Sequence, residues 1–142
     1  MKKLTPLLAL VCTGLSAYSQ KIDASKVPDT VKTLFAKLYP AATGQSWELE
    51  KGRYEVEFKQ NGTAMALVFK PDGTLTETEM GIKTDELPSK ALSYIQEHYR
   101  GKQIKEASRI TKARGEINYE AEVDGKDVIF DASGKFLKVE KD

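Results

Sequence analysis

The sequence predicts an α+β fold of two tandem repeats, each a helix followed by about four antiparallel strands. The first observation is a duplication: VPDTVKTLFAKLYP, beginning at Val27, recurs about 60 residues later as LPSKALSYIQEHYR, beginning at Leu87. The second is that YEVEF at Tyr54 and YEAEV at Tyr119 each precede a hairpin signal and a closing strand. Apolar residues repeat with a helical period and then with a period of two, as in helices packed on a sheet.

Each repeat opens with a helix that is apolar on one side. Pro28 suits the first helical turn, where a missing N–H costs nothing, and Pro40 ends the first helix after Tyr39. The apolar stripe consists of Val27, Val31, Leu34, Phe35 and Leu38 in the first helix and of Leu87, Ala91, Tyr94, Ile95 and His98 in the second.

The strands that follow alternate apolar and acidic residues, which predicts one core face and one wet face. Asn61-Gly62 and Asp124-Gly125 are typical of tight hairpins, and a linker is expected at residues 81–86. The predicted core residues are Phe35, Leu38, Trp47, Tyr54, Val56 and Phe58 in the first repeat and Ile95, Tyr119 and Val123 in the second.

The N-terminus has the pattern of a secretory signal peptide over residues 1–19: two lysines, a short apolar stretch and a small-x-small cleavage pattern before Gln20. Residues 20–142 then form one domain, with repeats at about 27–80 and 87–140. Cys12 lies in the apolar stretch, but Val11 precedes it where lipoprotein signals need a small residue. We therefore expect a periplasmic or secreted protein with no cysteine after cleavage and no stable membrane insertion.

Composition argues against several functions. The formal charge is +1, and acids and bases are mixed throughout, so no attraction to nucleic acid follows. His98 is the only histidine, which leaves no His-based metal cluster or catalytic triad, and we read it as a half-buried helix residue rather than a general base. No segment has EF-hand spacing. We expect no cofactor, no metal and no catalytic residues.

VPDTVKTLFAKLYP, Trp47, GRYEVEFKQNG and FKPDGTL together resemble the PepSY-like family of secreted Bacteroidetes proteins, also described as beta-lactamase-inhibitor-like. The resemblance covers residues 27–140. It implies a fold like that of beta-lactamase inhibitory protein and a binding or inhibitory role. The second repeat departs from the pattern, because Arg100 replaces Pro40 and Ala107 replaces the tryptophan.

Glu55 and Glu57, with Glu120 and Glu122, place two carboxylates on the outer face of the equivalent strand in both repeats. Such a pair can be a solvated face, a partner-binding surface, a cation site or an acid/base pair. Acid/base work requires burial that separates the two pKa values, which an exposed face does not provide. We take these glutamates as candidate partner-binding residues on a face that is mainly solvated.

Trp47 is a further candidate for partner binding, although its alternation with Leu49 favours the core. Asn61-Gly62-Thr63 matches a glycosylation sequon, but a hairpin turn explains the same residues.

The sequence therefore favours an exported, non-catalytic binding module, an inhibitor or modulator of a secreted or periplasmic protein such as a peptidase. The alternatives are a periplasmic protein that binds a small ligand or a cation, and a small hydrolase with paired glutamates. Neither the partner nor the oligomeric state can be read from the sequence.

Overall fold

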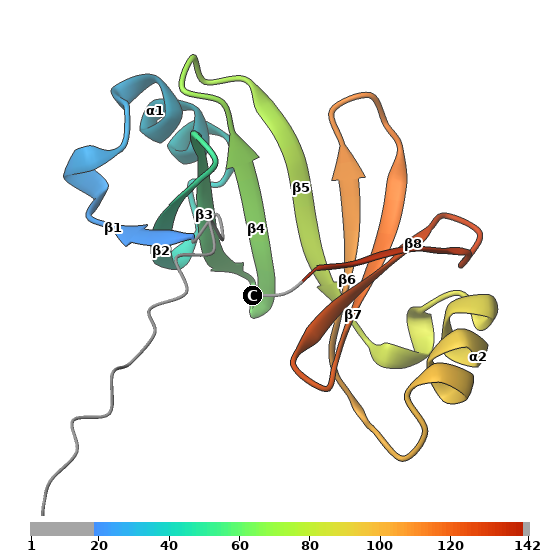
Figure 1. The fold of residues 1–142 in the computed structure, drawn as a ribbon. Coiled ribbons are helices and arrows are strands. Elements are labelled where there is room, and N and C mark those ends of the chain that lie inside the picture. Colours follow the sequence, from blue (N-terminus) through green and yellow to red (C-terminus); the bar gives the residue numbers. More distant parts are fainter. Residues whose placement is uncertain (1–18, 141–142) are drawn as a thin grey trace, which may run out of the picture.

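The computed structural model describes residues 19–140 as one open antiparallel sheet with two α-helices (Figure 1). The strands of this part of the chain follow sequence order from β1 to β9, and each pairs with the next. The α+β class with antiparallel strands is thus confirmed. The elements are β1 (Gln20–Ile22), η1, a 3₁₀ turn (Ala24–Lys26), α1 (Asp29–Leu38), β2 (Thr43–Glu50), β3 (Arg53–Gln60), β4 (Thr63–Phe69), β5 (Leu75–Ile82), η2, also 3₁₀ (Thr84–Glu86), α2 (Ser89–His98), β6 (Ile104–Lys112), β7 (Ile117–Val123), β8 (Lys126–Asp131) and β9 (Phe136–Glu140). The predicted signal peptide lies outside the described residues, apart from Ser19.

The strand β5 belongs to both halves of the molecule. Residues 77–80 pair with β4 on one side and with β6 on the other, whereas Leu75 pairs only with β4 and Ile82 only with β6. Ile82 at its end lies opposite Ala107, just as Ile22 in β1 lies opposite Trp47. Of the predicted linker at residues 81–86, Gly81 and Ile82 instead belong to β5, where Ile82 packs against the second core, and residues 83–86 with η2 connect β5 to α2.

Two hydrophobic cores lie beneath the two helices. Phe35 on α1 meets Trp47 and Phe58 edge-on, with ring centroids 5.6 and 5.0 Å apart. The predicted core residues are buried or packed against a core, except Leu38, whose prediction is wrong: it is 44% exposed at the end of α1. The chain leaves the helix at Tyr39, whose ring takes the place beside Phe58 at 4.9 Å. The buried residues are Val27, Val31, Phe35, Trp47, Val56, Phe58, Leu67 and Phe69 in the first core and Leu87, Ala91, Ile95, Ala107, Ala121, Val123, Val128 and Phe130 in the second.

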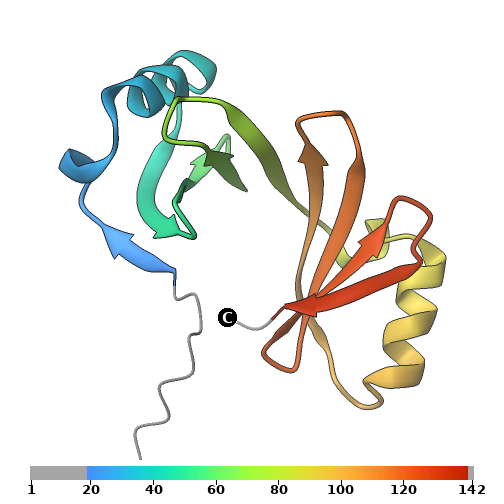
Figure 2. The same cartoon turned by 45° about the horizontal axis from the view of Figure 1, so that its top comes forward.

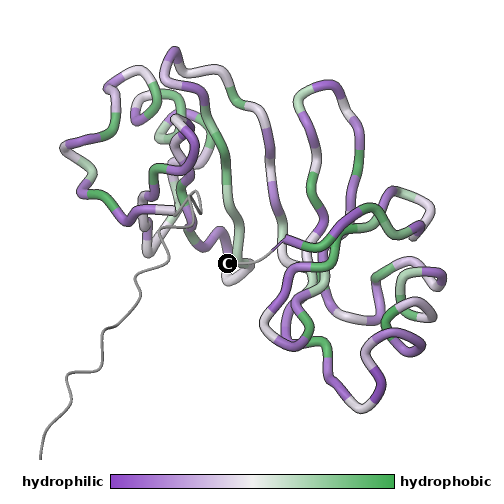
Figure 3. The backbone as a smooth tube through the Cα atoms, viewed as in Figure 1, coloured by the Kyte–Doolittle hydropathy of each residue, from purple (hydrophilic) through white to green (hydrophobic). Residues whose placement is uncertain are grey.

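Both helices cover the same face of the sheet. Val56 lies opposite Leu67, which lies opposite Thr78, and Thr78 shares its side of β5 with Ile82 of the second core. In the ribbon the helices flank the molecule on the outside, and the helix-free face turns inward between the two halves (Figures 1 and 2). Hydrophilic and hydrophobic residues alternate along the strands (Figure 3).

Candidate functional site: the helix-free face of the sheet

The glutamates of β3 point to the helix-free face because their neighbours are held in the core. Val56 and Phe58 are buried under α1, so the intervening Glu55 and Glu57 project to the other side. Across the β2–β3 pairing, Glu48 lies directly opposite Glu55. Like charges in directly opposed positions destabilise a sheet, so the fold carries this arrangement at a cost.

A third glutamate, Glu79 on β5, lies in the same row of the sheet as Glu57. The small Ala66 of β4 separates them, since it is the partner of both residues in the strand register. We call Glu55, Glu57 and Glu79 the acidic cluster. Sequence reasoning missed Glu79, although the alternation Thr76-Glu77-Thr78-Glu79 carries the same period-two signal as the strand at Tyr54.

Burial and mutual repulsion raise the pKa values of the glutamates in the acidic cluster. The pKa of Glu55 is raised to about 7, first by burial and then by the negative charges of Glu79, Glu57, Glu48 and Glu50. No ion pair within residues 19–140 involves Glu55. The expectation of a fully wet face is therefore wrong at this position, because Glu55 is half-buried.

The pKa values of the other two glutamates of the acidic cluster are also raised. The pKa of Glu79 is raised by burial, with the Ser108 hydroxyl as hydrogen-bond partner opposing part of the change and Glu57 adding to it. The more exposed Glu57 also has a raised pKa, first through desolvation and next through Glu48, against which Lys21 acts. The cluster thus gathers carboxylates whose mutual repulsion the described surroundings offset only in part.

Glu77 is adjacent to the cluster along β5 but has cationic partners. Its Oε1 lies 3.4 Å from an Arg53 guanidinium nitrogen and 3.0 Å from Lys112 Nζ. The contrast with Glu55 shows that lysine and arginine side chains neutralise only part of this face.

The predicted pair on β7 lies on the same face but outside the cluster. Three strands separate β7 from β3. Glu122 lies opposite Glu106 and pairs with Lys105, whose Nζ is 3.0 Å from its Oε1. Glu120 is half-buried between Ser108 and Ile129 in the register. The structure therefore does not gather the four predicted glutamates into one site.

Apolar side chains form part of the same face although no helix covers it. Ala66, Ile110 and Ile129 are buried, and Ile110 lies opposite Glu79. The sheet curves inward around this face (Figure 2). The face thus carries acidic side chains around apolar residues that are already buried.

Trp47 lies in the core and is 6% exposed, in agreement with the preferred interpretation. One edge of its ring borders a surface recess of about 590 Å³ that Phe35, Tyr39 and Pro40 also line. A partner-binding role for Trp47 stays a prediction.

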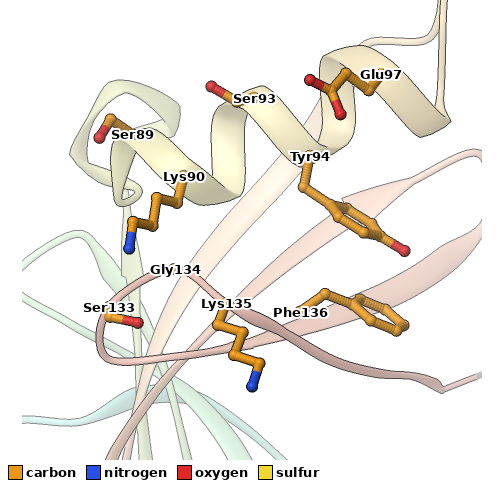
Figure 4. A pocket seen from close by; sticks show the side chains of 9 residues that line it. All are labelled: Ser89, Lys90, Ser93, Tyr94, Glu97, Ser133, Gly134, Lys135 and Phe136. Atoms are coloured by element: carbon orange, nitrogen blue, oxygen red, sulfur yellow. The ribbon is translucent and has the colours of Figure 1, made fainter.

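A second recess, of about 440 Å³, lies between α2 and the β8–β9 turn (Figure 4). Tyr94 and Phe136 are stacked there with centroids 4.7 Å apart, and His98 stacks on the other side of Tyr94 at 3.9 Å. The predicted half-burial of His98 is wrong: its ring is exposed at the end of α2, and its Nδ1 lies 2.9 Å from the Tyr94 carbonyl oxygen.

Within residues 19–140 no group of histidine, cysteine and acidic side chains has the arrangement of a metal site. No helix in this part of the chain combines the length and the apolar character needed to cross a membrane.

The family model described as "Putative beta-lactamase-inhibitor-like, PepSY-like" matches residues 15–77 and 52–138. The chain belongs to this family. The resemblance drawn from the sequence is therefore confirmed. A comparison with curated proteins gives no match.

Solved structures share the fold of this PepSY-like chain. A protein from Bacteroides eggerthii, described as a putative periplasmic protein, is 20% identical with a TM-score of 0.69, over 80% of this chain and 88% of the other. A DUF2874 family protein from Bacteroides uniformis is 18% identical with a TM-score of 0.67, over 80% and 88%. A BLIP-like protein from Bacteroides fragilis is 21% identical with a TM-score of 0.56, over 80% and 85%. At these identities the likeness shows the fold alone.

Proposed function

We propose that this PepSY-like protein is an exported, non-catalytic binding module, whose helix-free face binds a protein partner through basic side chains of that partner. The observation that carries this proposal is the acidic cluster, where Glu55 is half-buried with a pKa raised to about 7 and has no ion pair within residues 19–140. A lysine or arginine placed among these carboxylates would remove the repulsion and gain charge-assisted hydrogen bonds.

The surroundings of the cluster fit a protein partner better than a small ligand. The face is an extended sheet surface that presents several partly exposed charged side chains, as the polar part of a protein interface does. Neither recess described above lies on it, since both adjoin a helix. Export is supported by the signal pattern of residues 1–19, and the neighbour from Bacteroides eggerthii is described as periplasmic. An inhibitory effect on an envelope or extracellular protein, such as a peptidase, is the form of modulation that the family description suggests.

Acid/base catalysis is the competing use of a carboxylate with a raised pKa. It would require a second group with a separate role beside Glu55. The charges that raise the pKa of Glu55 all belong to further glutamates, and the pKa values of Glu57 and Glu79 are also raised, so among the described residues no charged group of a different kind stands beside Glu55 for the second role. This arrangement supports attraction of cations over proton transfer.

Affinity capture with matched baits tests the proposal. The baits are the wild type, the cluster variant Glu55→Gln/Glu57→Gln/Glu79→Gln, and a control that removes three exposed acids elsewhere, Asp29→Asn/Asp85→Asn/Glu97→Gln. We expect an envelope protein that the wild type and the control retain and the cluster variant loses, with binding that weakens as salt rises. Equal capture by all three baits, or no captured protein, would contradict the proposed face.

A further inference from the structure

The free edge of β9 is equivalent to an edge that is paired elsewhere in the same chain. Phe136 lies opposite Phe130 as Leu75 lies opposite Phe69, so β9 occupies the position in the second half that β5 occupies in the first. On its other side β5 is paired with β6. Among the described strands β9 pairs with β8 alone and ends the sheet. Its free edge is therefore built like one that accepts an antiparallel strand.

This edge also exposes apolar side chains. Leu137 is 46% and Val139 is 38% exposed, and they stand two positions apart on the five-residue strand. Every second backbone N–H and C=O of an edge strand points away from its neighbour and lacks a partner in the sheet. Exposed apolar residues beside unpaired backbone groups form a template for strand pairing.

The charges of β9 complement a second copy of the same strand. Lys138 and Glu140 project on the same side of the sheet and form an ion pair with each other. In an antiparallel pair centred on Val139, Lys138 of each copy would lie opposite Glu140 of the other. A pair centred one residue earlier would oppose two lysines, which is unfavourable. The charges of the strand thus favour the register centred on Val139 over the one centred on Lys138.

We propose that β9 pairs with β9 of a second copy of this chain, antiparallel and about a two-fold axis at Val139, so that two sheets become continuous. The contact is isologous, because the same residues contribute from both copies. With the axis at Val139, only residues 138–140 of this five-residue strand lie opposite each other, so the association belongs to the weak, concentration-dependent class. It leaves the acidic cluster, on β3 and β5, outside the contact.

Cysteine cross-linking tests the register directly. All variants carry Cys12→Ala and are made as the full exported chain, since Cys12 is the only natural cysteine. Paired residues in antiparallel strands have Cα atoms about 4.5–5.5 Å apart, which suits a disulfide. We expect Val139→Cys to form disulfide dimers under mild oxidation far faster than Leu137→Cys on the same strand or Lys21→Cys on β1 at the other edge. Equal rates for Val139→Cys and Lys21→Cys would overturn the proposal.

A charge exchange tests the same register without cysteine. In sedimentation equilibrium, Lys138→Glu should weaken the dimer about tenfold, because it opposes two glutamates at each of two positions. The double variant Lys138→Glu/Glu140→Lys should restore wild-type association. Self-pairing would be overturned by a wild type that stays monomeric to high micromolar concentration, or by a double variant that associates no more strongly than the single variant. It would also be overturned if the edge bound an extended segment of another protein instead of a second copy.

Discussion

Replacement of Glu55 by glutamine should stabilise the protein at alkaline pH and leave its stability unchanged in acid. The carboxyl has a pKa raised from 4.5 to about 7, so the folded state binds this proton more tightly than the unfolded state does. The free energy of unfolding therefore falls as pH rises between these two values and stays lowered above them. At 1.36 kcal/mol per pKa unit, ionised Glu55 costs at most about 3 kcal/mol, and partial solvent exposure brings the expected gain from Glu55→Gln to about 2 kcal/mol.

Urea unfolding at a series of pH values measures this effect, with fluorescence of the single, buried Trp47 as the signal. The gain in the free energy of unfolding from Glu55→Gln should reach its full size above the folded pKa of about 7 and should vanish near pH 4.5. The exposed Glu97 on α2 supplies a matched control, and Glu97→Gln should follow the wild type throughout. A Glu55→Gln curve that runs parallel to the wild type at every pH would refute both the burial of this carboxyl and its repulsion by the cluster.

Two further predictions concern the core and the turns. Phe58→Ala should lower the free energy of unfolding by about 3–5 kcal/mol, because the ring is buried between Phe35 and Tyr39, and an unchanged thermal midpoint would contradict the assigned core face. Gly134→Ala should lower the free energy of unfolding, measured in urea, by about 1–3 kcal/mol more than Gly73→Ala does. Both glycines have positive φ, but only at Gly134 would the new Cβ lie 2.8 Å from Pro88 Cβ. Equal losses would show that the turn shifts freely away from α2.

Local sequence patterns predicted most of the fold, because the strand alternation and the duplicated helix are both clear in the sequence. The period-two alternation around Val56 assigned the two faces of β3 correctly, and the duplicated helix placed Phe35 and Ile95 in separate cores. The prediction for Leu38 was wrong because the apolar stripe was extended to the last residue of α1. The chain turns there, and the ring of Tyr39 covers the core instead.

The candidate site was predictable only in part, because its properties depend on pairing between distant strands. The sequence shows that Glu55 points away from the core, but the opposition of Glu48 and the approach of Glu79 follow from strand register. The register of β5 with β6 also places the buried Ile110 opposite Glu79 on the face without helices. No local pattern encodes these pairings.

The last strands of the two repeats differ in charge at one equivalent position. In the register with the preceding strand, Glu77 and Glu79 of β5 correspond to Lys138 and Glu140 of β9. In the first copy the position of Glu79 faces Ala66 and contributes to the acidic cluster, whereas in the second the lysine and glutamate form an ion pair on a free edge. Because β5 is paired on both sides and β9 on one, a charge at these positions acts within the sheet in the first copy and remains available to another strand in the second. Duplication of a single unit can thus yield two different surfaces, the difference arising from whether the last strand has a neighbour.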